Sequence, residues 1–324
     1  MLRSAVPSAV SIRTLVNNPS SKSGEAFRVV EVGARDGLQN EKKMVPTAIK
    51  VELINKLSEV GLKTVEATSY VSPKWVPQMG DHDNVITQIK KYPGVAYPVL
   101  VPNLAGLKNA LQNENVKEIA VFGAASEGFS KKNINCSIEE GFNRIKEVTE
   151  EALKNNLRVR GYISTVIACP YDGKTKPSVV ADLTEKLLSF GCYEVSLGDT
   201  IGAGGAGSVG RLLDEVSKAA PLEKLAVHFH DTYGQALSNV LVAINRGIRV
   251  ADSSIAGLGG CPYAVGATGN LATEDLVYML HDLGFNTGIN LPKLIQTSEW
   301  ICAQMGRNNA SRASIALLSK KKKL

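Results

Sequence analysis

The chain has 324 residues, of which 44% are hydrophobic and 21% are charged, as is typical of a globular protein. No stretch approaches the roughly 18 uninterrupted apolar residues that a membrane span needs, which argues against a transmembrane protein. The net charge of +6 arises at the two ends of the chain, and the nearly neutral body argues against a nucleic-acid-binding face.

The N-terminal leader, residues 1–24, contains Arg3, Arg13 and several serines and has no acidic residue. This composition is typical of a mitochondrial transit peptide, and the alternative is a merely disordered N-terminus. We therefore expect the protein in the mitochondrial matrix.

The body of the chain repeats one pattern, in which a short apolar run is followed by a polar or Gly-rich loop and then by a helical stretch. The predicted strands are Phe27–Val32, Lys63–Thr68, Val95–Val101, Val116–Phe122, Val159–Val166, Tyr193–Leu197, Leu225–His230 and Ala251–Ala256. The clearest predicted helices are Thr47–Val60, Ile138–Asn155, Val179–Phe190 and a final Leu291–Gly306. Strands that alternate with helices imply a parallel sheet, and eight such units indicate a closed barrel. We predict an α/β protein with one (β/α)8 barrel over residues 25–310 and an additional C-terminal helix.

Residues 311–324 are predicted to be a basic C-terminal tail that ends in four lysines and a leucine. The final Lys-Lys-Leu partly resembles the Ser-Lys-Leu peroxisomal signal, so a peroxisomal location is an alternative to a simple solvated tail.

The loops that follow the strands form the active face of such a barrel, and the most informative of them begins at His228-Phe229-His230. Residues i and i+2 of a strand point to the same side, so both imidazoles face one way. The alternative is a pair of buried, hydrogen-bonded histidines. Because the two lie at a predicted strand end, the spacing favours metal ligation.

Two further residues are candidate ligands for the same ion. Asp36 follows the first strand, which lies next to the eighth strand in a closed barrel, and Asn270 follows the eighth. Two nitrogen and two oxygen ligands with open positions suit Mg²⁺ or Mn²⁺, although Zn²⁺ is not excluded. The alternatives are a turn residue for Asp36 and a helix N-cap for Asn270.

Other polar residues of this face have candidate roles in catalysis. Arg35 can stabilise negative charge on an oxygen, and a surface salt bridge is the alternative. Cys261 lies in a Gly-rich loop and can move a proton or attack a substrate, unless it is an ordinary loop cysteine. The candidates that could orient ligands or substrate, or simply fill the barrel, are Glu66, Ser69, Ser196 and Asp199.

Taken together, the loops resemble the 3-hydroxy-3-methylglutaryl-CoA lyase family from about Phe27 to Gly306. The matching segments are VVEVGARDGLQNEK (Val29–Lys42), VEATSYVSPKWVPQMGD (Val65–Asp81), EVSLGDTIGAG (Glu194–Gly204), HFHDTYGQALSN (His228–Asn239) and AGLGGCPYAVGATGN (Ala256–Asn270). The HxH and Arg-Asp-Gly motifs alone would also fit isopropylmalate and homocitrate synthases. The GLGGCPYA loop points to the lyases.

The resemblance implies a divalent-metal-dependent enzyme that cleaves (S)-3-hydroxy-3-methylglutaryl-CoA to acetoacetate and acetyl-CoA, in ketogenesis and leucine degradation. It implies that the metal ligands are Asp36, His228, His230 and Asn270. It further implies that Arg35 neutralises the enolate, that Cys261 transfers a proton, and that Glu66 and Asp199 support the site. The base is His228 or Asp36.

The implied partner is an acyl-CoA, and Lys42 and Arg307 are candidates for contact with its phosphates. We also expect a homodimer. Two other functions are weighed against the lyase. A Claisen-condensing synthase would carry a substantial further C-terminal region, whereas this chain ends soon after Gly306. A non-catalytic barrel that acts as a binding protein would be marked by loss of site residues, and all are present.

Overall fold

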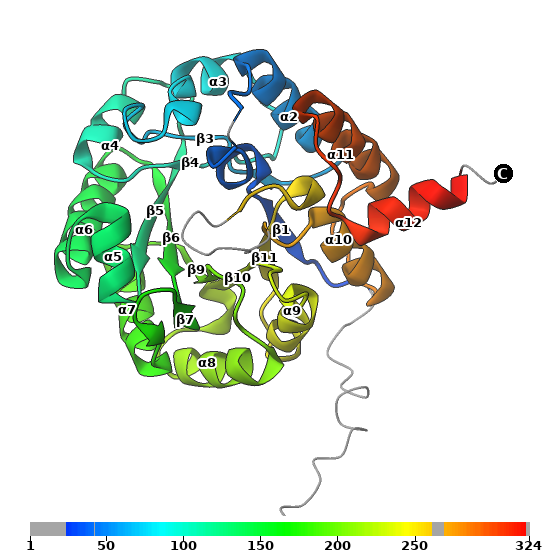
Figure 1. The fold of residues 1–324 in the computed structure, drawn as a ribbon. Coiled ribbons are helices and arrows are strands. Elements are labelled where there is room, and N and C mark those ends of the chain that lie inside the picture. The colour runs from blue at the N-terminus through cyan, green and yellow to red at the C-terminus, as the bar shows by residue number, and fades with distance from the viewer. Residues whose placement is uncertain (1–23, 42, 261–268, 322–324) are drawn as a thin grey trace, which may run out of the picture.

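Parallel strands at the centre of the molecule form the barrel in the computed structural model, which describes residues 24–41, 43–260 and 269–321 (Figure 1). In sheet order the strands are β2 (Thr64–Val65), β1 (Arg28–Glu31), β11 (Val250–Ser253), β10 (Leu225–Phe229), β9 (Glu194–Asp199), β6 (Arg158–Ser164), β5 (Glu118–Ala124), β4 (Val99–Leu100) and β3 (Thr68–Ser69).

The sheet closes on itself because β2 and β3 belong to one extended segment of the chain. Val65 of β2 pairs with Glu31 of β1, whereas Thr68 of β3 pairs with Val99 of β4. One segment therefore forms hydrogen bonds on both sides and makes the second of eight barrel strands. The predicted (β/α)8 barrel is confirmed, and each predicted strand overlaps an observed one.

Helices surround the strands on the outside of the barrel (Figure 1). They are α2 (Thr47–Glu59), α3 (His82–Gln88), α4 (Leu104–Ala110), α5 (Glu127–Ile134), α6 (Ile138–Lys154), α7 (Pro177–Phe190), α8 (Ala206–Ala219), α9 (Ala236–Asn245) and α10 (Thr273–Asp282). Helix α8 illustrates why they form, since Val209, Leu212, Leu213 and Val216 recur at helical spacing and are fully buried. Helix α6 begins at Ser137 in a reciprocal capping box with Glu140.

The C-terminal part adds two helices to the barrel. Helix α11 (Leu291–Met305) matches the predicted additional helix and packs against α2 and α10. The predicted basic tail, residues 311–324, contains helix α12 (Arg312–Lys321). Asp275 of α10 explains this helix, because its carboxylate accepts the backbone N–H groups of Arg312 and Ala313 at 3.2 and 2.7 Å. Ser311, directly before the helix, also accepts the backbone N–H of Ser314 at 3.0 Å, which is a local N-cap that the predicted tail did not take into account.

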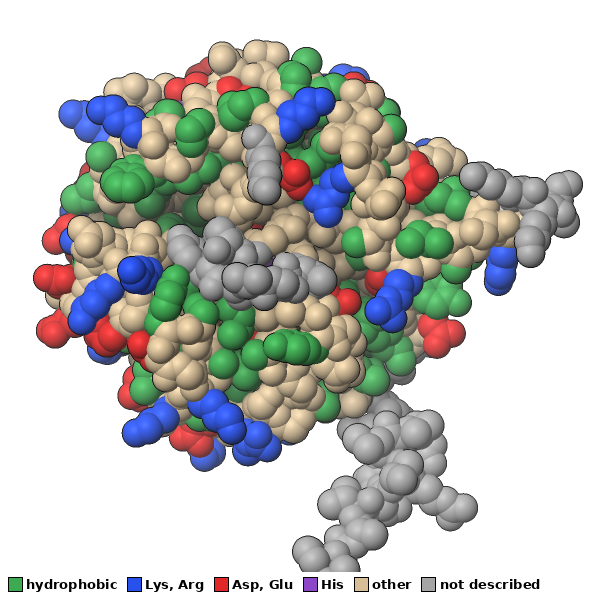
Figure 2. Space-filling model, viewed as in Figure 1, with side chains coloured by type: hydrophobic (Ala, Val, Ile, Leu, Met, Phe, Trp, Pro, Cys, Tyr) green, Lys and Arg blue, Asp and Glu red, His purple; other side chains and the backbone are tan. Residues whose placement is uncertain are grey.

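The surface carries charges of both signs. Figure 2 shows basic and acidic side chains interspersed around the face viewed in Figure 1, with no large region of one sign. Among the helices that the structure describes, none is both long and apolar enough to cross a membrane.

Glu31 is a fully buried carboxylate that joins the turns after β1 and β11. Its Oε1 accepts the backbone N–H groups of Gly33 at 2.7 Å and Ile255 at 2.9 Å, and its Oε2 accepts the hydroxyl of Thr273 at 2.6 Å. Glycine at position 33 leaves room for this carboxylate, because a Cβ there would lie 2.5 Å from Glu31 Oε1 and would displace it. Burial raises the pKa of Glu31 to about 8, even though the hydrogen bonds partly offset this effect.

We expect the pH dependence of stability to report this carboxylate. The folded-state pKa of Glu31 lies above the ordinary value of 4.5. Its contribution to the free energy of unfolding is therefore fully present below about pH 4.5 and is lost as the pH rises through about 8. The melting temperature of the wild type should therefore fall more between about pH 6 and about pH 9 than that of Glu31→Gln. Glu139→Gln, an exposed carboxylate on α6, is the control for loss of one charge. Equal pH slopes for wild type and Glu31→Gln would contradict the expectation.

Candidate metal and active site

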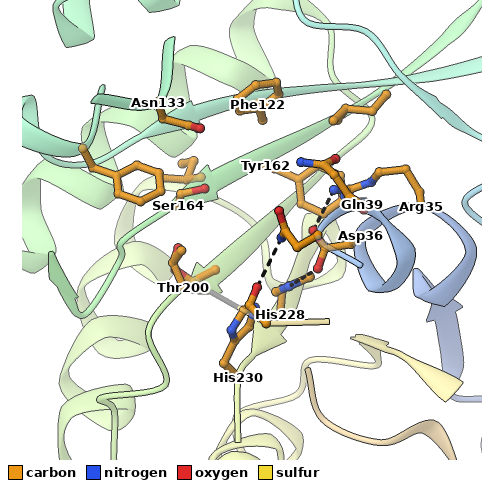
Figure 3. A pocket seen from close by; sticks show the side chains of 16 residues that line it. Arg35, Asp36, Gln39, Phe122, Asn133, Tyr162, Ser164, Thr200, His228 and His230 are labelled. Atoms are coloured by element: carbon orange, nitrogen blue, oxygen red, sulfur yellow. Dashed lines mark hydrogen bonds and ion pairs between the residues drawn. The ribbon is translucent and has the colours of Figure 1, made fainter. Parts of the chain in front are cut away.

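A cavity of about 170 Å³ opens at the carboxyl ends of the barrel strands. Arg35, Asp36 and Gln39 enter it from the turn and helix after β1, and His228 and His230 enter it from the end of β10 (Figure 3). The opposite wall is formed by Phe122, Asn133, Tyr162, Ser164 and Thr200. The face is the one that carries active sites in barrels of this type.

Asp36, His228 and His230 come together in this cavity, with one ligand atom from each within 4.8 Å of the others. Strand alternation places the two imidazoles on the same side, with ring centroids 5.6 Å apart. Asp36 lies on the π-helical turn Gly33–Gly37, and its Oδ2 is 3.9 Å from His228 Nε2. Arg35, His228 and His230 outweigh the effect of burial and lower the pKa of Asp36 to about 2, so this carboxylate is ionised.

Asp252, a buried carboxylate of β11, orients His228 from the side of the ring that faces away from the cavity. The Nδ1 of His228 lies 3.2 Å from Asp252 Oδ2, so Nδ1 carries the proton and Nε2 faces the cavity. Burial lowers the pKa of His228, but the hydrogen bond and charge of Asp252 raise it above its ordinary value. A carboxylate behind a histidine is the usual support for a metal ligand.

His230 supplies the clearest test of whether a cation fits. Its Nδ1 is buried and has no hydrogen-bond partner among the described residues. Burial and the neighbouring His228 lower the pKa of His230 to about 4, so the ring is neutral and has a free lone pair. A buried polar nitrogen without a partner is costly, whereas the same nitrogen is a good ligand for a divalent cation. The residues present therefore fit a metal ion.

Asn270 reaches the same cluster from the segment before α10. Its Nδ2 donates to Asp36 Oδ2 at 2.8 Å and to the carbonyl of Leu258 at 3.1 Å. With its amide nitrogen held in this way, the amide oxygen is the atom that can ligate a cation. The resulting set of two imidazoles, one carboxylate and one amide suits Mg²⁺ or Mn²⁺ and does not exclude Zn²⁺.

Arg35 is fixed at the edge of the cavity by two carboxylates. Its Nη1 contacts Asp36 Oδ1 at 2.8 Å, and its Nη2 contacts Glu66 Oε2 at 3.0 Å. The hydroxyl of Tyr162 also donates to Glu66 Oε2 at 3.0 Å, and the Tyr162 ring centroid is 5.8 Å from the Arg35 guanidinium carbon. Burial alone would lower the pKa of Arg35, but Glu66 and Asp36 raise it further above its ordinary value. The site therefore holds a permanent cation.

Three other candidate residues lie behind the cavity wall and do not line it. Ser69 Oγ accepts the backbone N–H of Val71 at 3.2 Å, and Ser196 Oγ donates to Asp252 at 2.8 Å. Asp199 accepts the N–H groups of Ala203 and Gly204 and so shapes the loop into α8. Burial raises the pKa of Asp199.

Two of the predicted residues, Lys42 and Cys261, lie outside the described residues. Gly260, next to Cys261, lines the cavity. Arg307 forms an ion pair with Glu41 at 2.6 Å, near the turn that carries Arg35.

Tyr162, Asp252 and Arg160 are not among the site residues predicted from the sequence. A signal for them exists, because Arg160 and Tyr162 alternate along a strand of the barrel and point to one side. Asp252 pairs in register with His228, so a charged residue at that point of a buried strand could have been connected with the histidine.

Comparisons with known proteins agree on one family. The HMGL-like family model matches residues 26–301. The mitochondrial hydroxymethylglutaryl-CoA lyase of Homo sapiens is 53% identical over 97% of this chain and 98% of its own length. The cytoplasmic 3-hydroxy-3-methylglutaryl-CoA lyase of Rattus norvegicus is 55% identical over 90% of this chain and 85% of its own length.

Solved structures show the same similarity. The hydroxymethylglutaryl-CoA lyase of Pseudomonas aeruginosa is 53% identical with a TM-score of 0.89, over 92% of this chain and 99% of that one. An HMG-CoA lyase of Acinetobacter baumannii has been solved in complex with coenzyme A and 3-methylmalate. It is 37% identical with a TM-score of 0.86, over 90% of this chain and 95% of that one.

The free nitrogen of His230 leads to a prediction for metal binding. A cation that binds only the folded state stabilises it, by about 2.7 kcal/mol at 100 times the dissociation constant. We expect MnCl₂ to raise the melting temperature of the wild type in a thermal shift assay and to have a much smaller effect on His230→Ala. His281→Ala, in which an exposed histidine of α10 is removed, should respond like the wild type. A full response of His230→Ala would exclude this histidine as a ligand.

Proposed function

The chain belongs to the hydroxymethylglutaryl-CoA lyase family, and from that premise we propose which of its residues carry out the reaction. It is a carbon–carbon lyase that cleaves 3-hydroxy-3-methylglutaryl-CoA to acetoacetate and acetyl-CoA, and it uses a divalent metal. The observation that supports the assignment of residues is the convergence of Asp36, His228 and His230 beside Arg35 in one cavity. A condensing synthase and a non-catalytic barrel are not favoured, because relatives at over half identity are lyases.

We propose that the metal is Mg²⁺ or Mn²⁺ and that Asp36, His228, His230 and Asn270 hold it. When bound, such an ion lowers the pKa of a coordinated hydroxyl and polarises a neighbouring carboxylate. Asp252 supports this role, because it holds the proton on Nδ1 of His228 and leaves Nε2 free.

Cleavage requires a base for the tertiary hydroxyl and a cation for the enolate that leaves. Asp36 and His228 are the two candidate bases, since both face the cavity from the side of the proposed metal. As the carbon–carbon bond breaks, charge develops on the thioester oxygen. Arg35 is the fixed cation at the cavity edge and would stabilise that charge. Glu66 holds Arg35 in place.

The remaining roles follow from the family resemblance. Cys261 would protonate the carbon of the acetyl-CoA enolate from the Gly-rich loop. Lys42 would contact the coenzyme A phosphates, and the coenzyme A complex of the Acinetobacter relative supports an acyl-CoA substrate. Ser69, Ser196 and Asp199 would shape the site from behind its wall.

We further propose that the protein is a homodimer of the mitochondrial matrix and that residues 1–24 direct it there. The mitochondrial relative supports this location. The cytoplasmic relative shows that members of the family also occur elsewhere, and a peroxisomal location remains the alternative.

A coupled assay for acetyl-CoA and acetoacetate tests the residue roles. With Mn²⁺ or Mg²⁺, the wild type should cleave (S)-3-hydroxy-3-methylglutaryl-CoA, and a chelator should abolish the activity. Arg35→Gln should lower kcat by about 10²- to 10³-fold, because one preorganised group that stabilises the developing oxyanion is lost. His228→Ala should also require far more metal, and Cys261→Ala should lose most of its activity.

Arg144→Gln, on the exposed side of α6, is the matched control for Arg35→Gln and should behave like the wild type. If Arg35→Gln kept the wild-type kcat at saturating metal, the proposed role in enolate stabilisation would be wrong.

The leader can be tested separately from the chemistry. Residues 1–24 fused to a fluorescent protein should direct it into mitochondria, because an Arg- and Ser-rich segment without acidic residues is typical of imported leaders. A fusion in which Arg3 and Arg13 are both replaced by Glu is the control. A cytosolic signal from the unaltered fusion would contradict the proposed targeting.

A further inference from the structure

Arg160 is a buried arginine that the proposed chemistry does not use. It lies on β6 below the floor of the cavity and is 1% exposed. Its Nε donates to Glu194 Oε1 at 2.8 Å, and its Nη2 donates to Asp252 Oδ1 at 2.7 Å. Its Nη1 is shared between Asp252 Oδ2 at 3.1 Å and the hydroxyl oxygen of Tyr162 at 2.7 Å. One guanidinium thus contacts three different side chains.

Two of these contacts connect Arg160 with the two functional parts of the site, which are the proposed metal ligand His228 and the cation Arg35. On one side, Asp252 holds Nδ1 of His228 at 3.2 Å and so sets the direction of a proposed metal ligand. On the other side, the hydroxyl of Tyr162 donates to Glu66, and Glu66 in turn contacts Arg35 at 3.0 Å. Arg160 is the residue in which the two chains of contacts meet.

The third contact, with Glu194, holds the guanidinium from the side of the N-terminal ends of the strands. Glu194 accepts from Arg160 and also from Arg28, whose side chain is 33% exposed at the opposite end of the barrel. The guanidinium is therefore fixed from both sides along the barrel axis. A lysine could not replace it, because an ammonium is a point charge without the planar arrangement of five N–H donors.

We propose that Arg160 is a positioning residue that fixes His228 through Asp252 and Arg35 through Tyr162 and Glu66, so that metal binding and enolate stabilisation depend on one buried guanidinium. The proposal rests on the function proposed above for His228 and Arg35. A merely structural arginine would change stability alone, whereas a positioning residue changes two separable properties of the site.

Single substitutions should separate the two chains of contacts. Asp252→Asn should weaken Mn²⁺ binding by about 10- to 100-fold, because the group behind a metal ligand is altered. Tyr162→Phe should leave the Mn²⁺ dissociation constant at the wild-type value and lower kcat at saturating Mn²⁺ by about tenfold or more, because Arg35 loses its fixed direction. Arg160→Lys keeps the positive charge and should show both defects.

The experiment measures the Mn²⁺ dissociation constant without substrate, by titration calorimetry, and kcat and KM for (S)-3-hydroxy-3-methylglutaryl-CoA at saturating Mn²⁺. Arg158→Lys is the matched control, since Arg158 lies on the same strand with its side chain 63% exposed and pairs with Glu118 rather than with Asp252 or Tyr162. It should match the wild type in both measurements.

Wild-type Mn²⁺ affinity and kcat in Arg160→Lys would overturn the proposal, even if its melting temperature fell. If Arg160→Lys does not fold, the other two variants decide, and unchanged affinity in Asp252→Asn together with unchanged kcat in Tyr162→Phe would overturn it. A wild-type protein that binds Mn²⁺ but does not cleave the substrate would instead refute the proposed function, while the affinity measurements would still test the contact through Asp252.

Discussion

The pairing of β1 with β11, and of β11 with β10, is the constraint on which the site depends. Val29 pairs with Ala251, and Asp252 pairs with His228, so the beginning of the barrel is joined in register to its end. Asp36 and the two histidines are far apart in the sequence, and this pairing brings their ligand atoms within 4.8 Å. A shift of one residue in a strand would turn its side chains to the other face, and His228 would no longer face the cavity.

The interior of the barrel is unusual in holding charges where such folds commonly hold branched aliphatic side chains. Arg160, Glu194 and Asp252 are each at most 2% exposed. Burying ions is costly, and breaking such a pair leaves an uncompensated charge. The arrangement tolerates that cost because each carboxylate faces a guanidinium with hydrogen-bond geometry. The buried ion pairs keep these side chains in one orientation, since groups held in this way cannot rotate away from the site.

The strands and major helices were predictable from the sequence, because the alternation of apolar runs with helical periodicity is a local signal. The residues around the proposed metal were predictable from their place at strand ends. Tyr162, Asp252 and Arg160 were not found, since their importance arises from contacts between different strands. Helix α12 has a local N-cap in Ser311 as well as the cap that Asp275 supplies from α10, and only the second of these depends on the fold. Local sequence patterns predict the secondary structure of a segment, but they do not identify the residues that the fold brings into contact with it.

Arg35 and Asp36 are consecutive residues that must both face one cavity, and the π-helical turn at Gly33–Gly37 makes this possible. Its wider turn reduces the angle between successive side chains, and such turns are frequent at functional sites. Asp36 then meets Arg35 through Oδ1 and the Asn270 amide through Oδ2. The carboxylate thus lies between a fixed guanidinium and the place proposed for a metal ion. The guanidinium is held in position by the folded protein, and a metal ion held by these residues would be fixed too, so little reorganisation would be needed when negative charge forms on the substrate.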